Sequence, residues 1–224
     1  MKIFVIGGHK NGTKSIHEWF IKRGLKSCHR DHRYRNQHII KTFDCFSDHF
    51  AEFGFIDSVK KLDKKYPNSL FILNYRTLPS YINSLLKHLL WHNVKERKWK
   101  WNTPGRATFS QRIINTHNTN QYAINYFSLV KKRMLVINLC NGENENNTKI
   151  LENFIGLKHN PEILLDHKTH NIPSLDEPDM KNEYIKNINK INTETDIVYK
   201  HISDKDYVDR LDLASELCKK LYLK

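Results

Sequence analysis

The sequence predicts an α/β fold, a three-layer parallel β-sheet flanked by helices, and three observations predict it. A short apolar, β-branched run at 3–6 passes through a glycine-containing turn into an amphipathic helical pattern. Two longer apolar runs, at 69–75 and 134–139, have the length of buried strands. Helical patterns separate these runs, and strands that alternate with helices favour a parallel sheet.

The elements are expected in the following chain order. The predicted strands cover about 2–7, 25–29, 38–43, 69–75 and 134–139. The predicted helices cover about 14–23, 56–66, 79–92, 109–132, 149–155 and 203–221. Pro79 opens the third helix, because proline is well accommodated in a first helical turn. Three prolines, at 161, 173 and 178, mark residues 158–180 as a long loop.

Length and composition are typical of one soluble domain over residues 1–224, with a core at about 1–157 and a C-terminal loop and helix at 158–224. No apolar run approaches the roughly 18–20 residues of a membrane span. Four cysteines are scattered without motif spacing. We expect them to be reduced thiols, which points to a cytoplasmic location.

The net charge of +13 favours an anionic ligand, an anionic substrate or nucleic acid. An alternative interpretation is that the lysine, asparagine and isoleucine content reflects the base composition of the coding genome. A basic nucleic-acid-binding protein without catalysis therefore stays open, although the nucleotide-binding features described next argue against nucleic acid as a partner.

The turn after the first strand has the character of a phosphate cradle. It contains glycines, two lysines and two hydroxyl side chains, in the order Gly8, His9, Lys10, Asn11, Gly12, Thr13, Lys14, Ser15. Glycines let the backbone approach a phosphate, and the N-terminus of the next helix favours negative charge. The chain is therefore expected to bind a phosphorylated nucleotide.

One interpretation of this loop is a degenerate Walker A motif of a kinase or nucleotide triphosphatase. Gly8 to Ser15 has the length of G-x-x-x-x-G-K-[ST], and Lys14-Ser15 matches its end. Thr13 stands where the second glycine belongs. Neither 70–75 nor 134–139 ends in an aspartate that could hold magnesium.

A second interpretation fits more residues. The loop resembles the 5′-phosphosulfate loop of the P-loop-like sulfotransferase family, Pro-Lys-x-Gly-Thr-[Thr/Ser], through Lys10, Gly12 and Thr13. His9 replaces the proline, and Lys14 replaces a hydroxyl residue. Arg76 at a strand end and Ser84 eight residues later resemble the family's 3′-phosphate site. The likeness covers about residues 1–157.

The resemblance implies a P-loop-like sulfotransferase fold and a transfer of sulfate without metal. The donor would be 3′-phosphoadenosine-5′-phosphosulfate (PAPS), and the product adenosine 3′,5′-bisphosphate (PAP). Lys10 would stabilise the bridging oxygen of the leaving group, and the 5′-phosphate would lie on His9 and on the backbone of 11–15, held also by the hydroxyls of Thr13 and Ser15. Lys14 would add charge there or face solvent. The acceptor would be a small molecule or a glycan, and an acidic one would suit the basic chain.

The resemblance also implies a general base after a central strand, within residues 38–49. Asp44, Asp48 and His49 are the candidates, of which Asp48 is favoured for its distance upstream of Arg76. Lys41 could assist Lys10. The acids could instead cap a turn or the next helix.

Two other features carry weaker indications. His88, His92 and Glu96 share one helix face at a spacing that can bind zinc, but no fourth ligand is evident, and a structural role is favoured. Lys95–Arg106 interleaves cations with tryptophans, which is typical of a loop that stacks on an aromatic or acidic acceptor, or of a solvated loop. Residues 93–108 and 158–180 are the expected acceptor loops.

Overall fold

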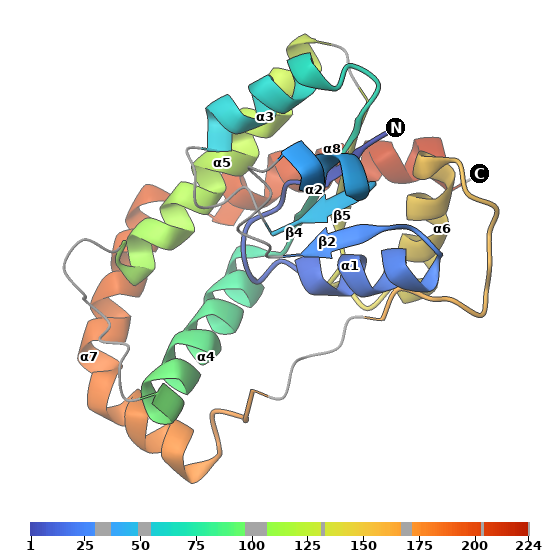
Figure 1. Cartoon of the computed structure of the whole chain (residues 1–224). Coiled ribbons are helices and arrows are strands. Elements are labelled where there is room, and N and C mark those ends of the chain that lie inside the picture. The colour runs from blue at the N-terminus through green and yellow to red at the C-terminus, as the bar shows by residue number, and fades with distance from the viewer. Residues whose placement is uncertain are drawn as a thin grey trace. The chain divides into compact units, whose positions relative to one another are not determined.

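The computed structural model describes residues 1–29, 37–48, 55–96, 107–130, 133–166, 172–202 and 204–223. Its strands are β1 (Ile3–Val5), β2 (Ser27–His29), β3 (Cys45–Ser47), β4 (Leu70–Tyr75) and β5 (Met134–Asn138) (Figure 1). Its helices are α1 (Thr13–Lys22), α2 (Gln37–Thr42), α3 (Phe55–Lys65), α4 (Leu78–Glu96), α5 (Phe109–Leu129), α6 (Asn144–Ile155), α7 (Pro178–His201) and α8 (Asp204–Tyr222).

The described residues divide into two compact units, which are described separately. The first contains 1–76, 119–168 and 209–224, and therefore the whole sheet. The second contains 77–118 and 169–208. The single-domain organisation over 1–224 stays a prediction. Among the described helices, none is long and apolar enough to cross a membrane.

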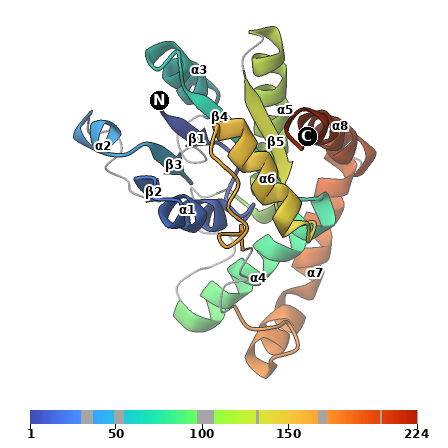
Figure 2. The same ribbon diagram turned by 90° about the vertical axis from the view of Figure 1, so that its right-hand side faces the viewer.

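The sheet of the first unit has five parallel strands in the order β2-β3-β1-β4-β5, which confirms the α/β class. Helices cover the sheet, with α1 and α6 on one face and α3 with the second half of α5 on the other (Figure 2). Every residue of β4 is buried, as is typical of a strand inside a parallel sheet covered on both faces.

A row of aromatic rings crosses three strands on one face of the sheet. Phe4 is paired in register with Phe46 and with Phe71, and its ring centroid is 5.4 Å from each of theirs. Phe127 of α5 covers Phe71 at 4.6 Å. This row explains why β3 lies beside β1, because Phe46 completes the apolar layer that Phe4 begins.

The strand predicted at 38–43 is wrong. Residues 37–42 form α2, and the third strand is Cys45–Ser47. Ile39, Ile40 and Thr42 have high strand propensity, but a strand at 38–43 beside β1 would bring Lys41 into a fully buried sheet. The three-residue strand that replaces it buries Cys45, Phe46 and Ser47 instead.

The open edge of β5 is covered by the C-terminal helix. The Val136 N–H donates to the sulfur of Cys218 at 3.4 Å, so α8 supplies a partner on the side of β5 that no strand occupies. At the end of α8, Tyr222 meets Phe154 of α6 edge-on at 5.3 Å. An edge strand covered in this way offers no open ladder for another chain.

The second unit is helical and contains the largest element that the sequence analysis missed. Helix α7 lies beside α4 (Figure 1), and the Asn93 amide donates to Glu183 at 3.5 Å. The Ser110 N–H donates to Glu194 of α7 at 2.9 Å. The predicted loop 158–180 therefore ends where Pro178 begins a helix, in the position that proline favours.

Candidate functional site

The loop between β1 and α1 is fixed to the neighbouring strand by one buried side chain, Asn74 of β4. The Gly7 N–H donates to Asn74 Oδ1 at 3.1 Å, and Asn74 Nδ2 donates to the Asn11 carbonyl at 2.7 Å. Asn74 is fully buried. A Cβ at Gly7 would lie 2.1 Å from the Asn74 carbonyl oxygen, so only glycine fits there.

Two non-glycine residues of the site adopt left-handed backbone conformations. Lys10 has φ 67° and Asp48 has φ 62°. Gly12, at φ 90°, precedes the first turn of α1. A left-handed lysine costs on the order of 1 kcal/mol, and such conformations persist where the surrounding structure imposes them, often at functional sites.

Side chains of the first turn of α1 differ in their surroundings. Thr13 and Ser15 are buried near the helix N-terminus. Lys14 is exposed and lies 3.6 Å from Glu18 one turn later, which favours the solvent-facing alternative for Lys14. The Asn11 amide is fully buried, and neither its Nδ2 nor its Oδ1 has a hydrogen-bond partner among the described residues. Buried amides without partners are rare, and they mark places where a ligand can bind.

Asp48 follows β3 directly, so its carboxylate lies at the carboxyl end of the strand beside β1. His9 of the loop approaches it, with Nδ1 2.7 Å from Oδ1. His29 at the end of β2 approaches from the other side, with Nε2 3.9 Å from Oδ2. The side chain of Asp48 is 3% exposed, whereas that of His9 is 31% exposed. A buried carboxylate therefore lies between two imidazoles.

Hydrogen bonds and ring stacking extend this cluster of His9, Asp48 and His29 to His17 and to two serines. His29 Nδ1 lies 2.9 Å from Ser47 Oγ, and His17 Nδ1 lies 2.8 Å from Ser27 Oγ. The rings of His17 and His29 stack at 5.2 Å. Burial lowers the pKa of His17, with Lys14 acting in the same direction and Glu18 against it. Ser47 is fully buried, so it cannot act as a nucleophile despite its histidine neighbour.

Arg76 follows β4 at the same carboxyl end of the sheet as the loop, since β1 and β4 are parallel. Burial raises the pKa of the Cys140 thiol, and the positive charge of Arg76 opposes that shift, so Arg76 acts on the segment after β5. Ser84 lies in α4, in the second compact unit. A joint phosphate site of Arg76 and Ser84 stays a prediction.

The structure separates the candidates for the general base. Asp44 precedes β3 and lies 3.9 Å from Lys2, so it is at the amino end of the sheet, opposite to the loop. Lys41 is exposed in the last turn of α2, before the same amino end. His49 lies outside the described residues. The geometry favours Asp48, because of the two candidate aspartates it is the one that the described structure brings to the loop.

Three features of this site were missed from the sequence. Asn74 was read only as part of an apolar strand, although a lone amide in Leu70–Tyr75 signals a buried polar partner. The sequence does not connect His29 with Asp48, because nothing local joins the two residues. Asp48 itself was not recognised as the end of a strand, because the third strand was expected at 38–43.

The predicted zinc-binding residues of α4 and the predicted acceptor loop at 93–108 lie only partly within the described residues. The rings of His88 and His92 meet edge-on at 4.4 Å, and the described residues contain no group of three or more side chains placed to hold a metal ion. Most of the basic aromatic segment Lys95–Arg106 lies outside the described residues.

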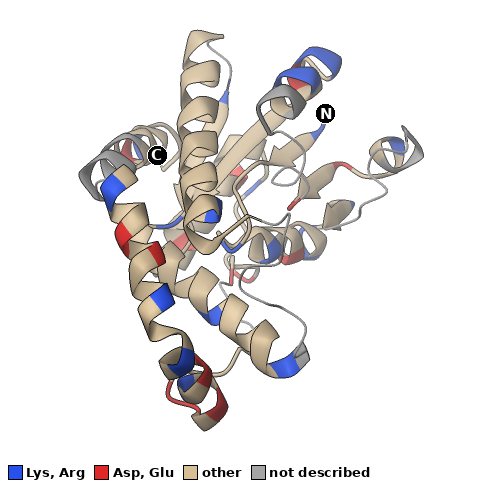
Figure 3. Ribbon diagram, turned by 90° about the vertical axis from the view of Figure 1, so that its left-hand side faces the viewer, with Lys and Arg blue, Asp and Glu red and all other residues tan. Residues whose placement is uncertain are grey.

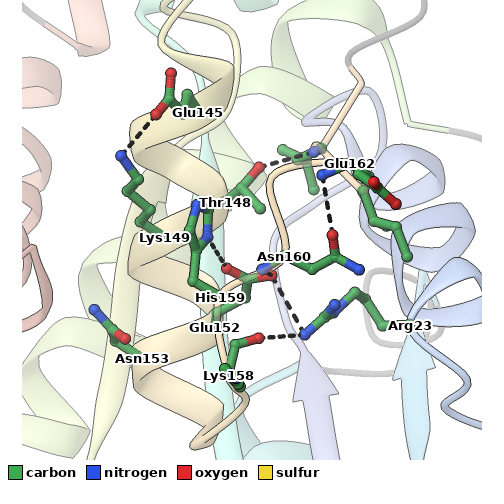
Figure 4. Close-up of polar contacts among 12 residues, drawn as sticks. Arg23, Glu145, Thr148, Lys149, Glu152, Asn153, Lys158, His159, Asn160 and Glu162 are labelled. Carbon is green, nitrogen blue, oxygen red and sulfur yellow. Dashed lines mark hydrogen bonds and ion pairs between the residues drawn. The ribbon is translucent and has the colours of Figure 1, made fainter.

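The first half of the predicted acceptor loop 158–180 is attached to α1 and α6 (Figure 4). Glu152 of α6, whose side chain is fully buried, lies 2.5 Å from His159 Nδ1 and accepts the Asn160 N–H at 3.2 Å. Arg23, which directly follows α1, lies 3.4 Å from Glu152 and donates to the Lys158 carbonyl at 2.6 Å. Residues 158–160 are thus held in place by Glu152 and Arg23, which gives this segment a structural role.

Comparison with protein-family models, with curated proteins and with solved structures found no match to this chain. Its function is therefore argued from its own residues.

Proposed function

We propose that this chain is a sulfotransferase, which moves a sulfuryl group from PAPS to a hydroxyl or amine of a small-molecule or glycan acceptor. The supporting observation is the loop at 7–12, held by Asn74 beside the N-terminus of α1, with the buried, unpartnered Asn11 amide inside it. The sequence resemblance through Lys10, Gly12, Thr13, Arg76 and Ser84 selects this donor among phosphorylated nucleotides.

In this proposal the loop binds and orients the donor. The first-turn N–H groups of α1 have no acceptor within the helix, and they favour an anion together with the helix dipole. Thr13 and Ser15 would donate hydroxyl hydrogen bonds to the 5′-phosphate. Arg76 would contribute a charged, forked donor to the 3′-phosphate.

Lys10 would stabilise the negative charge that develops on the bridging oxygen as the sulfur–oxygen bond breaks. Catalysis of such transfers depends mainly on positioning and on electrostatic stabilisation of the leaving group. The left-handed backbone at Lys10 is consistent with a lysine whose direction is imposed by the loop.

A magnesium-dependent kinase or nucleotide triphosphatase is the second candidate, and Asp48 favours it. Neither strand considered from the sequence ends in aspartate, but Asp48 directly follows β3, and β3 is a strand beside β1. A carboxylate in that position could hold a magnesium ion near the loop. Against this candidate, His9 lies 2.7 Å from the same carboxylate.

A nucleic-acid-binding protein without catalysis is the third candidate. Helix α7 carries both Lys and acidic residues along its length, so it does not present a continuous basic stripe (Figure 3). Helix α5 contains a single charged residue, Arg112. A steep fall of RNA or DNA affinity with salt would support this candidate.

The deciding experiment is calorimetric titration with PAP and, separately, with ATP and magnesium. We expect PAP to bind without magnesium, and Arg76→Ala to weaken binding about 10- to 100-fold, as the loss of a charged hydrogen bond does. Arg133→Ala is the matched control, because Arg133 precedes β5 at the opposite end of the sheet. Binding of ATP only with magnesium would overturn the sulfotransferase proposal in favour of the second candidate.

A further inference from the structure

We propose that the outer side of α8 is a dimerisation surface, on which α8 of a second copy of this chain packs in the antiparallel direction. This surface, the leucine face, consists of Leu213, Leu217 and Leu221, which are 64%, 54% and 66% exposed. All three lie in the first compact unit, together with the sheet. The proposal does not depend on the sulfotransferase function.

Helix α8 carries apolar residues on two sides. Its inner side contains Leu211 and Cys218, which are buried, and the Cys218 sulfur accepts the Val136 N–H at the edge of β5. Its outer side contains the leucine face, where a leucine recurs every four residues, so that the three side chains form one ridge. One apolar side is enough to pack a helix on a sheet. The additional exposed leucines therefore indicate a second partner.

Two charged residues beside the leucine face favour a second copy as that partner. Glu216 and Lys220 are exposed and lie four residues apart, so they flank the leucine ridge on the same side. A two-fold axis between antiparallel helices brings the acid of each copy beside the base of the other, so the face is complementary to itself. An anionic membrane surface would attract Lys220 but repel Glu216.

The charges and the leucines agree on one register. With the two-fold axis level with Cys218, Glu216 of each copy lies beside Lys220 of the other. The same register places Leu217 of one copy between Leu217 and Leu221 of the other, as the packing of ridges into grooves requires. A parallel pair would instead set Glu216 against the side of the other helix that carries Ala214, which offers no base at that level.

The contact is small, so the dimer should be weak. Ridges of residues four apart pack at a crossing angle of about 50°, and the two helices then touch over a short length. Such a contact is smaller than the roughly 800 Å² per partner of a standard interface. The net charge of +13 adds a long-range repulsion between copies, which salt screens. We expect a dissociation constant of about 10–100 μM, and tighter association as the salt concentration rises.

The first test is sedimentation of the full chain over a concentration range of about 5–500 μM. We expect a concentration-dependent dimer in the wild type, and association at least about 10-fold weaker in Leu217→Gln, because Leu217 lies at the centre of the contact. Ile21→Gln is the matched control, since Ile21 on α1 is also 54% exposed. A wild type that stays monomeric throughout, or a dimer that Leu217→Gln leaves intact, would overturn the proposal.

The second test exchanges the charges and reports on the antiparallel register. Glu216→Lys and Lys220→Glu should each weaken association about 10-fold, because like charges then meet twice. An equimolar mixture of the two variants should recover the wild-type level of dimer, since the bases of one meet the acids of the other. Glu216 also lies 3.0 Å from Lys219 of its own chain, but losing that contact cannot cause recovery in the mixture. A mixture no more dimeric than its components would refute antiparallel packing.

Vesicles distinguish a lipid surface from a second copy. The wild type at about 1 μM, where the expected dimer is dissociated, is mixed with vesicles of phosphatidylcholine and phosphatidylserine. We expect the wild type and Leu217→Gln to bind these vesicles equally, through the net charge alone. Binding that Leu217→Gln abolishes and Ile21→Gln retains would assign the leucine face to a membrane and overturn the proposal.

Discussion

Lys10, the residue to which we assign the leaving-group role, has an unfavourable backbone conformation. Its φ of 67° lies in the region that glycine occupies readily and that side chains with a Cβ disfavour. A lysine is retained there in a loop whose two ends are fixed by Asn74. This conflict between local preference and observed conformation is typical of functional sites.

We predict that Lys10→Gly is more stable than Lys10→Ala by about 1 kcal/mol, because glycine removes the strain that alanine keeps. Both variants should lose sulfate transfer to the same extent. Urea unfolding of the two variants measures the difference. Lys14 offers the matched control in the first turn of α1, where the helix should make Lys14→Ala more stable than Lys14→Gly. Equal stability of the two Lys10 variants would contradict the strain argument.

At the scale of elements, Asn74 connects the loop to β4, and Gly7 allows the close approach. We predict that Asn74→Ala lowers the free energy of unfolding by about 1–3 kcal/mol, because the Gly7 N–H and the Asn11 carbonyl lose a buried partner. PAP affinity should fall as well. Chemical denaturation and calorimetry measure the two effects, and a variant of normal stability and affinity would refute this role.

Gly7→Ala tests the same contact from the other side. A Cβ there would meet both the carbonyl oxygen and the side chain of Asn74. We therefore expect Gly7→Ala to be destabilised, and we expect Asn74→Ala to give no rescue in the double variant, because the backbone oxygen remains. Thermal unfolding of the single and double variants measures this. Rescue in the double variant would show that the side chain alone blocks the methyl group.

Glu152 tests the attachment of residues 158–160 to α6. We predict that Glu152→Ala costs about 3 kcal/mol, since Arg23 and His159 lose a fully buried carboxylate. Amide hydrogen exchange of 158–165 should accelerate. Glu145→Ala is the matched control on the same helix, where an exposed pair with Lys149 should contribute less than about 1 kcal/mol. Similar losses in both variants would contradict the structural role of Glu152.

At the scale of the whole molecule, stability should fall at alkaline pH. Burial, aided by Asp44, raises the pKa of Cys45 to about 12. Burial and a hydrogen bond to Asp63 raise the pKa of Tyr126 to about 12. Burial raises the pKa of Tyr75 as well. The unfolded chain ionises these groups at lower pH, so their contribution is complete below about pH 9 and is lost as the pH rises toward 12.

The measurement is the free energy of unfolding in urea between pH 7 and pH 10.5. We expect it to decline above about pH 9, and we expect Cys45→Ala to flatten the first part of the decline. Exposed lysines contribute little difference between the two states in this range. A slope that Cys45→Ala leaves unchanged would show that another group is responsible.

The sequence of helix α7 contains apolar residues at helical spacing, a pattern that the sequence analysis did not interpret as a helix. Apolar or half-buried positions recur every three or four residues along it, at Met180, Tyr184, Ile188, Ile191, Thr195 and Val198. Its many asparagines and β-branched residues weaken helix propensity, and the prolines at 161, 173 and 178 suggested a loop. Packing beside α4 outweighs those local preferences, as tertiary contacts commonly do.

The sequence by itself determined the α/β class, four of the five strands, the glycine-containing turn between β1 and α1 and the position of Arg76 after a strand, because each is written in a contiguous run. Only the tertiary structure decided that Cys45–Ser47 is the third strand. With it came the meeting of Asp48, His9 and His29, and the attachment of the loop by Asn74. These contacts join residues that lie far apart in the chain, and they depend on strand order and on completing a buried aromatic layer, which no local pattern encodes.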